Sequence, residues 1–322
     1  MATYKGISGF NIKSLATDPS NFVEGEIWYN STSGSLKVAP MVGSWASGGN
    51  LTTARRNLGG AGIQTAALAI GGEAPQTGKT ESYDGTSWTE VADLNTARNT
   101  LGATGTQTAA IAFGGESVTT ATETWNGSSW TTSPNSLNTA VRSNAGFGTT
   151  AAAVAFGGLA SPGARTTVTE TWNGSAWATS PNSLPAATSN MGGFGISTAG
   201  VECSGEAVPG KTAVTSEWDG SAWASGGAMI TARSRMGAGI GTQTYGLVAG
   251  GDVPAITATA EIYNGTTWAA TGSLATARGS LAGLGPSSVS SDGLVSGGYT
   301  TSDTNATEEF TNIATVETIT TS

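Results

Sequence analysis

Six copies of one pattern, spaced 43 to 47 residues apart, constrain the fold of this chain more than any other feature. A copy contains a glycine doublet, an aromatic residue, a tryptophan five residues later and, after a short link, Leu-x-Thr-Ala-Arg or a related motif. The doublets begin at Gly71, Gly114, Gly157, Ser204, Gly250 and Gly297, the fourth being degenerate. A period of this length predicts that every copy forms the same small unit, and that neighbouring units stack.

Each copy has the pattern of four short strands. In the second copy, residues 109–113 are apolar and end at Gly114-Gly115, where the backbone must bend. Residues 122–125 alternate polar and apolar side chains, as a half-buried strand does. Asn126-Gly127 predicts a tight hairpin turn with positive φ at both residues, and Trp130 starts the returning strand. A segment rich in glycine and alanine after the arginine motif supplies the fourth strand.

Four-stranded units of this length are typical of β-propellers. The order of doublet, aromatic residue, tryptophan and arginine over residues 43–312 resembles the Kelch repeat. The resemblance implies an all-β fold: a six-bladed Kelch-like β-propeller in residues 39–322, with a short N-terminal β-hairpin extension in residues 1–38. Small residues such as Gly146 and Gly148 would let the inner strands crowd together, and the tryptophans would fill the space between sheets.

The N-terminal extension carries a second resemblance. Residues 25–38, Gly-Glu-Ile-Trp-Tyr-Asn-Ser-Thr-Ser-Gly-Ser-Leu-Lys-Val, have the pattern of a strand, a polar turn and a second strand. The segment is similar to one near the start of many structural proteins of tailed phages. That resemblance implies an attachment element, with Trp28, Tyr29 and Asn30 contacting other virion proteins. The alternative is a hairpin that only caps the ring.

Two segments compete to complete the last repeat. Gly43-Ser44-Trp45 matches the fourth-strand motif and is expected to pair with residues 307–311. Residues 314–320 also have a strand-like pattern and are able to take the same place. The sequence leaves both possibilities open.

Composition excludes several classes of protein. The chain has 13 Lys and Arg against 22 Asp and Glu, a net charge of −9, which argues against sequence-independent nucleic-acid binding. Residues 1–10 lack the apolar core and charged flank of a secretory signal, so we expect none there, and no run approaches the 18 apolar residues of a membrane span, so we expect no membrane insertion. The one cysteine, Cys203, is interpreted as a small buried hydrophobic residue.

The sequence contains no histidine, which removes histidine metal ligands, Ser-His-Asp triads and an imidazole base together. The copper enzyme among Kelch-type propellers, galactose oxidase, therefore has no counterpart here. The turn from Tyr83 to Trp88 resembles the Asp-box of sialidases but has the wrong offset between Asp, Gly and Trp. We expect a protein that is not an enzyme, with no catalytic residues, no cofactor and no metal.

Arginines recur once in most repeats, and each has a glutamate two residues before the first aromatic residue. The expected pairs are Arg55 with Glu81, Arg98 with Glu123, Arg142 with Glu170, Arg233 with Glu261 and Arg278 with Glu308. A residue present once per repeat is interpreted as a structural ion pair, and the alternative is a ring that binds an anion.

The links after the glycine doublets vary in length and content, and we expect them on one face of the ring. Loops on a rigid scaffold commonly carry binding specificity. The candidate binding residues in these links are Glu73, Gln76, Lys79, Glu116, Arg165, Glu206, Lys211 and Asp252.

The resulting hypothesis is a phage virion structural protein, displayed on a tail, fibre or capsid surface as part of a homo-oligomeric assembly. It would contact other virion proteins through its N-terminal segment, and host surface glycans or outer-membrane receptors through its variable face. The alternatives are an architectural decoration protein that binds no host molecule, and a bacterial protein-interaction scaffold.

Overall fold

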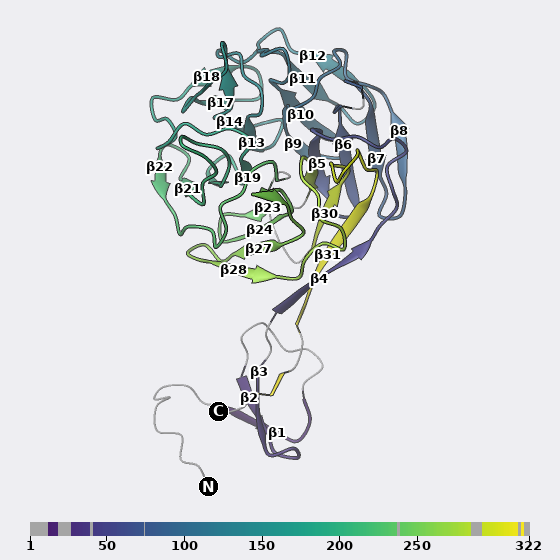
Figure 1. The fold of residues 1–322 in the computed structure, drawn as a ribbon, viewed down its shortest axis with the longest axis vertical. Coiled ribbons are helices and arrows are strands. Elements are labelled where there is room, and N and C mark those ends of the chain that lie inside the picture. Colours follow the sequence, from purple (N-terminus) through teal and green to yellow (C-terminus); the bar gives the residue numbers. More distant parts are fainter. Residues whose placement is uncertain are drawn as a thin grey trace. The chain divides into compact units, whose positions relative to one another are not determined.

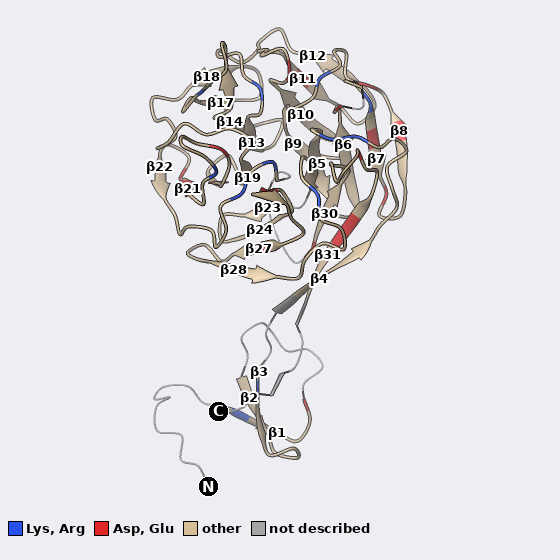
Figure 2. Cartoon of the chain, in the orientation of Figure 1, with Lys and Arg blue, Asp and Glu red and all other residues tan. Residues whose placement is uncertain are grey.

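The computed structural model describes residues 12–18, 27–38, 41–73, 75–236, 239–284, 292–314 and 317–318. All regular elements in these ranges are β-strands, which confirms the predicted all-β class (Figure 1). The chain divides into two compact units, residues 1–44 with 312–322 and residues 45–311. The sequence-based boundary between residues 38 and 39 stays a prediction. Charged residues are sparse along the ribbon (Figure 2), in agreement with a charged fraction of 11%.

The first unit contains a four-stranded sheet in the order β1 (Lys13–Leu15), β2 (Ile27–Asn30), β3 (Ser35–Val38), β32 (Glu317–Thr318). Strands β2 and β3 are antiparallel, so the predicted hairpin is confirmed for residues 27–38. Gly25 and Glu26 lie outside the described residues. The buried indole of Trp28 donates a hydrogen bond to Asp18 Oδ1 at 2.9 Å, and Asn30 Nδ2 donates to the same oxygen at 2.7 Å. Hydrogen bonds from Asn30 and Trp28 lower the pKa of Asp18.

Six four-stranded antiparallel sheets account for the described strands of residues 41–314 apart from two short hairpins. Sheet 1 holds β5 (Gly59–Ile63), β6 (Ala66–Ile70), β7 (Thr80–Tyr83) and β8 (Trp88–Val91); sheet 2 holds β9 (Gly102–Thr106), β10 (Ala109–Phe113), β11 (Thr122–Trp125) and β12 (Trp130–Thr132); sheet 3 holds β13 (Ala145–Gly148), β14 (Ala153–Phe156), β17 (Thr169–Trp172) and β18 (Trp177–Thr179). Sheet 4 holds β19 (Gly192–Ile196), β20 (Ala199–Cys203), β21 (Thr215–Trp218) and β22 (Trp223–Ser225); sheet 5 holds β23 (Ile240–Thr242), β24 (Tyr245–Ala249), β27 (Ala260–Tyr263) and β28 (Trp268–Thr271); sheet 6 holds β29 (Ala282–Leu284), β30 (Asp292–Ser296), β31 (Thr307–Ala314) and β4 (Met41–Ser47). The hairpins, β15 (Leu159–Ala160) with β16 (Ala164–Arg165) and β25 (Asp252–Val253) with β26 (Ala255–Ile256), lie in two of the links.

The sheets follow one another around a common centre (Figure 1), an arrangement consistent with a β-propeller. The first strands lie innermost: β5 contacts both β9 and β29, β13 contacts β9 and β19, and β23 contacts β19. Small residues make this approach possible. A Cβ added to Gly59 of β5 would lie 2.8 Å from the Cβ of Ala103 on β9, and one added to Gly60 would lie 2.9 Å from the carbonyl oxygen of Gly283 on β29.

Strand β4 completes sheet 6, beside β31. Of the two segments expected to complete the last repeat, the one that contains Trp45 therefore takes this place. The ring centroid of Trp45 lies 5.0 Å from that of Phe310. In the C-terminal segment, β32 pairs with β3 in the first unit, and residues 315–316 and 319–322 lie outside the described residues.

The tryptophans connect neighbouring sheets, as predicted. In five sheets, the indole of the fourth strand donates to a threonine hydroxyl on the third strand of the preceding sheet, at 2.9 to 3.0 Å. The pairs are Trp88 with Thr307, Trp130 with Thr80, Trp177 with Thr122, Trp223 with Thr169 and Trp268 with Thr215. In the sixth, Trp45 Nε1 donates to the carbonyl of Gly272 at 2.8 Å. Trp88 thereby joins the first sheet to the last.

The predicted hairpin turn at Asn126-Gly127 forms, but its geometry differs from the prediction. Trp125 pairs with Trp130, so the loop has four residues, and within the Asn126-Gly127 pair only Gly127 has positive φ. Asn126 acts through its side chain instead: Oδ1 accepts the backbone N–H groups of Ser128 and Ser129, both at 3.0 Å.

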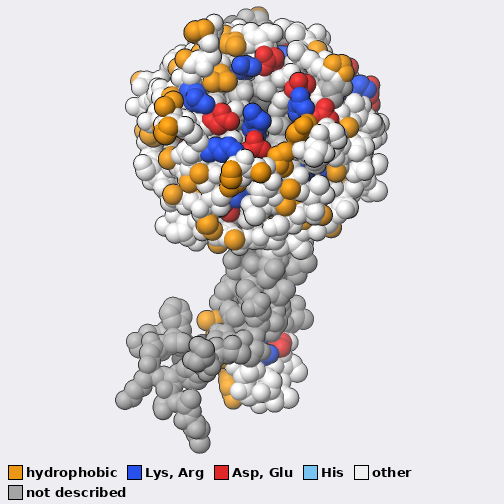
Figure 3. All heavy atoms as spheres, in the orientation of Figure 1, with side chains coloured by type: hydrophobic (Ala, Val, Ile, Leu, Met, Phe, Trp, Pro, Cys, Tyr) orange, Lys and Arg blue, Asp and Glu red, His pale blue; other side chains and the backbone are white. Residues whose placement is uncertain are grey.

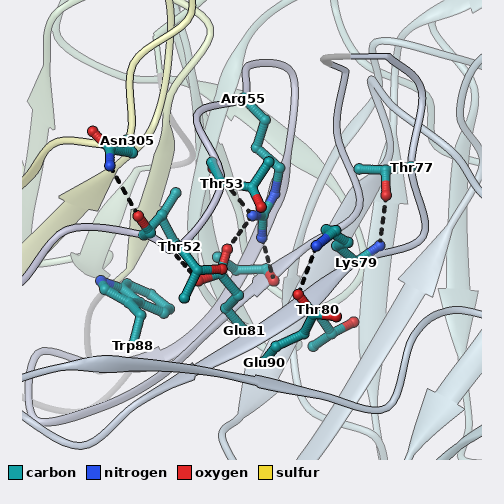
Figure 4. A network of polar contacts seen from close by, with 12 residues as sticks. Thr52, Thr53, Arg55, Thr77, Lys79, Thr80, Glu81, Trp88, Glu90 and Asn305 are labelled. Atoms are coloured by element: carbon teal, nitrogen blue, oxygen red, sulfur yellow. Dashed lines mark hydrogen bonds and ion pairs between the residues drawn. The ribbon is translucent and has the colours of Figure 1, made fainter.

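Four of the five predicted ion pairs are confirmed, and they are buried: Arg55 with Glu81, Arg98 with Glu123, Arg233 with Glu261 and Arg278 with Glu308. In sheet 1, the guanidinium of Arg55 also donates to the carbonyl of Gly71, and Glu81 accepts the backbone N–H of Thr52 (Figure 4). The pair therefore stabilises both the Gly-Gly corner and the segment that enters the sheet.

The prediction for Arg142 is wrong. Val141, buried at 5% exposure, occupies the position of the paired arginines, and Arg142 is one residue further on. Its guanidinium pairs with Glu116 at 2.8 Å. Glu170 instead accepts the backbone N–H groups of Asn138 and Thr139, at 2.7 and 2.8 Å.

Candidate functional site

A closed circle of backbone hydrogen bonds lies where the six sheets converge. One residue from each repeat donates its N–H to the carbonyl of the equivalent residue in the preceding repeat, at 2.6 to 3.1 Å, and the first repeat donates to the last. The six are Asn57, Thr100, Ser143, Asn190, Arg235 and Ser280. All have φ between 51° and 57°, a left-handed conformation that is uncommon for residues other than glycine. The hydrogen bonds hold the circle in this conformation, which costs about 1–3 kcal/mol per residue.

A cavity of about 990 Å³ opens over this circle. We call it the central bowl. Its charged lining residues are Arg56, Glu73, Glu116, Arg142, Glu206, Arg235 and Asp252. Figure 3 shows acidic and basic side chains alternating around a hollow in the middle of the face in view.

The glycine doublets position the residues that directly follow them at the wall of the bowl. Gly71 and Gly72 both have positive φ and turn the chain so that the next residue, Glu73, pairs with Arg56 through two backbone hydrogen bonds. The residue directly after the doublet lines the bowl in all six repeats: Glu73, Glu116, Leu159, Glu206, Asp252 and Tyr299. The same position thus presents a glutamate in three repeats and a leucine, an aspartate and a tyrosine in the other three.

Ion pairs fix the charged side chains of the bowl. Arg56 binds Glu73 at 3.2 Å and Asp303 at 3.1 Å, and Arg142 binds Glu116 at 2.8 Å. Burial lowers the pKa of Arg56, but the hydrogen bond to Glu73 and the charges of Asp303 and Glu73 outweigh it and raise the pKa overall. Every basic group here is close to an acidic one.

Two further ion pairs include lining residues of the bowl. Glu206 binds Arg165 at 3.2 Å, and Arg235 lies 3.6 Å from Asp252. With 55% of its side chain exposed, Arg235 is the most open of these groups. Tyr299 is the aromatic residue among the described lining residues, and Arg56 Cζ lies 5.0 Å from the centre of its ring.

The predicted binding residues divide into two groups. Those that line the bowl are Glu73, Gln76, Glu116, Glu206 and Asp252. Lys79 pairs with Glu90 on β8 at 2.6 Å and is not among the lining residues. Arg165 and Lys211 line a second depression of about 280 Å³, which shares Glu206 with the bowl and is also lined by the exposed Val208. Their roles in binding stay predictions.

The predicted attachment residues differ in exposure. Trp28 and Asn30 are buried in the first unit, and Tyr29 is 41% exposed. On this strand, the alternation of exposed and buried residues leaves Ile27 and Tyr29 open to a partner.

Arg56, Arg235 and Tyr299 were not predicted as site residues, and neither was the position of Arg142 at the bowl. A signal existed for Tyr299, because it directly follows a glycine doublet, as Glu73 does. Arg56 and Arg235 lie next to the recurrent arginines, and only the structure separates the buried set from the open one.

Comparison with known proteins gives no family. Neither the family models nor the curated proteins searched contain a match to this chain. Across the described ranges there is no grouping of three or more His, Cys, Asp or Glu side chains able to hold a metal ion. Nor do those ranges include a helix with the length and apolarity needed to cross a bilayer.

Proposed function

We propose that sheets 1 to 6 are the blades of a six-bladed Kelch-like β-propeller. The circle of six backbone hydrogen bonds supports this, because it passes once through every repeat and returns to its start. The bond from Trp88 to Thr307 supports closure at the outer edge in the same way.

On this scaffold, we infer that the chain is a non-enzymatic structural protein of a phage virion and that it binds a host surface glycan or receptor through the central bowl. The proposal that the protein binds a ligand is supported by the central bowl. The bowl is a cavity at the upper end of the usual range for ligand sites, about 300–1,000 Å³, and part of its wall comes from the variable links. The charged groups on these walls are paired with each other, an arrangement suited to holding a ligand rather than to activating a nucleophile.

The virion half depends on the similarity of residues 25–38 to segments of tailed-phage proteins. In the proposal, the exposed side chains of β2, Ile27 and Tyr29, contact the neighbouring virion protein.

A cell-binding assay tests the proposal. Fluorescently labelled full-length protein is added to cells on which the source phage grows, as wild type, as Tyr299→Ala with Arg235→Ala, and as the control Glu90→Gln, at an exposed residue of β8 outside the bowl. We expect saturable binding by the wild type and the control, and at least a tenfold loss for the double variant. Equal binding by all three proteins would show that the bowl is not the site, and absence of binding by the wild type would favour the architectural alternative.

A further inference from the structure

The charge balance of the central bowl restricts its ligand. Counting the partners that lie just outside the lining, four arginines (Arg56, Arg142, Arg165 and Arg235) face five acidic residues (Glu73, Glu116, Glu206, Asp252 and Asp303). The bowl therefore has no surplus of positive charge, and the whole chain has a net charge of −9. A sialylated or phosphorylated glycan, or an acidic peptide, would place its negative charges beside carboxylates, because each of these arginines already lies next to one.

The ion pairs are nevertheless open on one side. The side chains of Arg142 and Glu116 are each 35% exposed, and those of Arg56 and Glu73 are 32% and 36% exposed. Each pair therefore presents a fixed guanidinium edge, which donates, beside a fixed carboxylate edge, which accepts. A vicinal diol matches such a pair, because one hydroxyl accepts from the guanidinium while its neighbour donates to the carboxylate, and both hydrogen bonds are charge-assisted.

Tyr299 adds an apolar surface to this ring of donors and acceptors. The residue is fixed to the backbone of Gly279 by two hydrogen bonds of 2.8 and 3.0 Å, and Arg56 packs on its ring. A sugar ring has one face of C–H groups, which packs on an aromatic ring while the hydroxyls at its edge reach polar groups. The volume of about 990 Å³ suits several sugar units rather than one.

We propose that the central bowl binds the uncharged sugars of a glycan, with the Arg142–Glu116 and Arg56–Glu73 pairs holding vicinal hydroxyls and Tyr299 packing against a sugar ring. This inference rests on the proposed function and names the ligand class for the same site. Because preformed ion pairs make the contacts, binding of a neutral ligand is expected to depend little on salt.

Calorimetry with the full chain tests the inference. The probes are neutral tetrasaccharides (maltotetraose, mannotetraose, cellotetraose and chitotetraose), the anionic 3′-sialyllactose and a heparin tetrasaccharide, and a cationic chitosan tetramer. We expect at least one neutral probe to bind, with affinity changing less than threefold between 0.05 and 0.5 M NaCl. Tyr299→Ala and, separately, Arg142→Gln should each reduce that affinity at least tenfold, and the control Glu90→Gln, at an exposed residue of β8 outside the bowl, should leave it within twofold. Thermal melting of each variant checks that it folds.

The other outcomes overturn the inference in distinguishable ways. Binding of only the anionic or only the cationic probes, weakening as salt rises, refutes the neutral ligand class but leaves the bowl as a glycan site. Failure of every probe, together with cell binding that the bowl variants reduce, also refutes this ligand class and leaves the proposed function standing. If every probe fails to bind and the bowl variants do not change cell binding, both the neutral ligand class and the proposed binding function of the bowl are refuted.

Discussion

Sheet 4 contains a buried carboxyl group that should make the stability of this protein depend on pH. Thr188 and Ser216 occupy the positions of the paired arginine and glutamate in sheet 4, and Glu202 projects from the neighbouring strand β20 with 2% of its surface exposed. Thr188 Oγ1 lies 3.4 Å from Glu202 Oε1, and a hydrogen bond with Ser216 also contributes. Burial raises the pKa of Glu202 to about 8, against the lowering effect of these two hydrogen bonds.

The direction and size of the pH effect follow from the protonation of Glu202 in the folded and in the unfolded state. In the unfolded chain, Glu202 has its ordinary pKa of 4.5 and releases its proton above that pH, while the folded protein keeps the proton up to about pH 8. The folded state therefore binds more protons between these values, so the free energy of unfolding falls as pH rises from 4.5 to 8 and levels off above. Since each pH unit corresponds to about 1.4 kcal/mol, this one group accounts for a loss of about 5 kcal/mol across the window.

The variant Glu202→Gln removes the titration and keeps the shape and hydrogen-bonding capacity of the side chain. We expect urea unfolding at pH 4.5, 6, 7, 8 and 9 to show the wild type losing several kcal/mol more than the variant. The control Glu90→Gln, at a side chain that is 47% exposed, should follow the wild type. Parallel pH profiles for the wild type and Glu202→Gln would refute the reasoning.

Three further predictions concern the scaffold. Asn144 is buried and neither polar atom of its amide has a hydrogen-bond partner among the described residues, so Asn144→Leu should raise the free energy of unfolding by about 1–2 kcal/mol in urea; a decrease would contradict this. Arg98→Met leaves the carboxylate of Glu123 buried without its cationic partner and should lower the free energy of unfolding by about 3–5 kcal/mol in the same assay. A decrease of less than about 1 kcal/mol would mean that the pair is dispensable. Because β4 completes sheet 6, deletion of residues 315–322 should leave the melting temperature of the six sheets unchanged, and deletion of residues 1–47 should lower it by several degrees. A lower melting temperature after the C-terminal deletion only would mean that the C-terminal segment, and not β4, is the closing strand.

Much of the fold could be predicted because its signals are local and recur. The apolar run before Gly114, the alternation up to Trp125 and the return at Trp130 each specify a strand or its end, and the structure places strands β10, β11 and β12 there. The ion pair of Arg98 with Glu123 was predictable for the same reason, since residues that recur in step face each other in the same way.

The site was less predictable because its geometry depends on backbone conformation rather than on residue type. The backbone circle contains asparagine, threonine, serine and arginine, all with positive φ, so no shared side chain marks it in the sequence. Arg142 illustrates the difficulty: one residue separates the buried position of Val141 from the open wall of the bowl. The spacing from Leu137 distinguishes the two positions, because Val141 follows Leu137 at the same interval at which Arg98 follows Leu94.

The proposal that this protein is displayed on a phage particle and binds the host is tested most directly by electron microscopy of purified particles from the source that encodes the chain. The particles are labelled with a gold-conjugated antibody raised against residues 45–311. We predict label at the tail or its fibres, the positions that favour a role in host recognition. Label confined to the head would contradict the host-binding role, and particles without label would contradict the virion assignment itself.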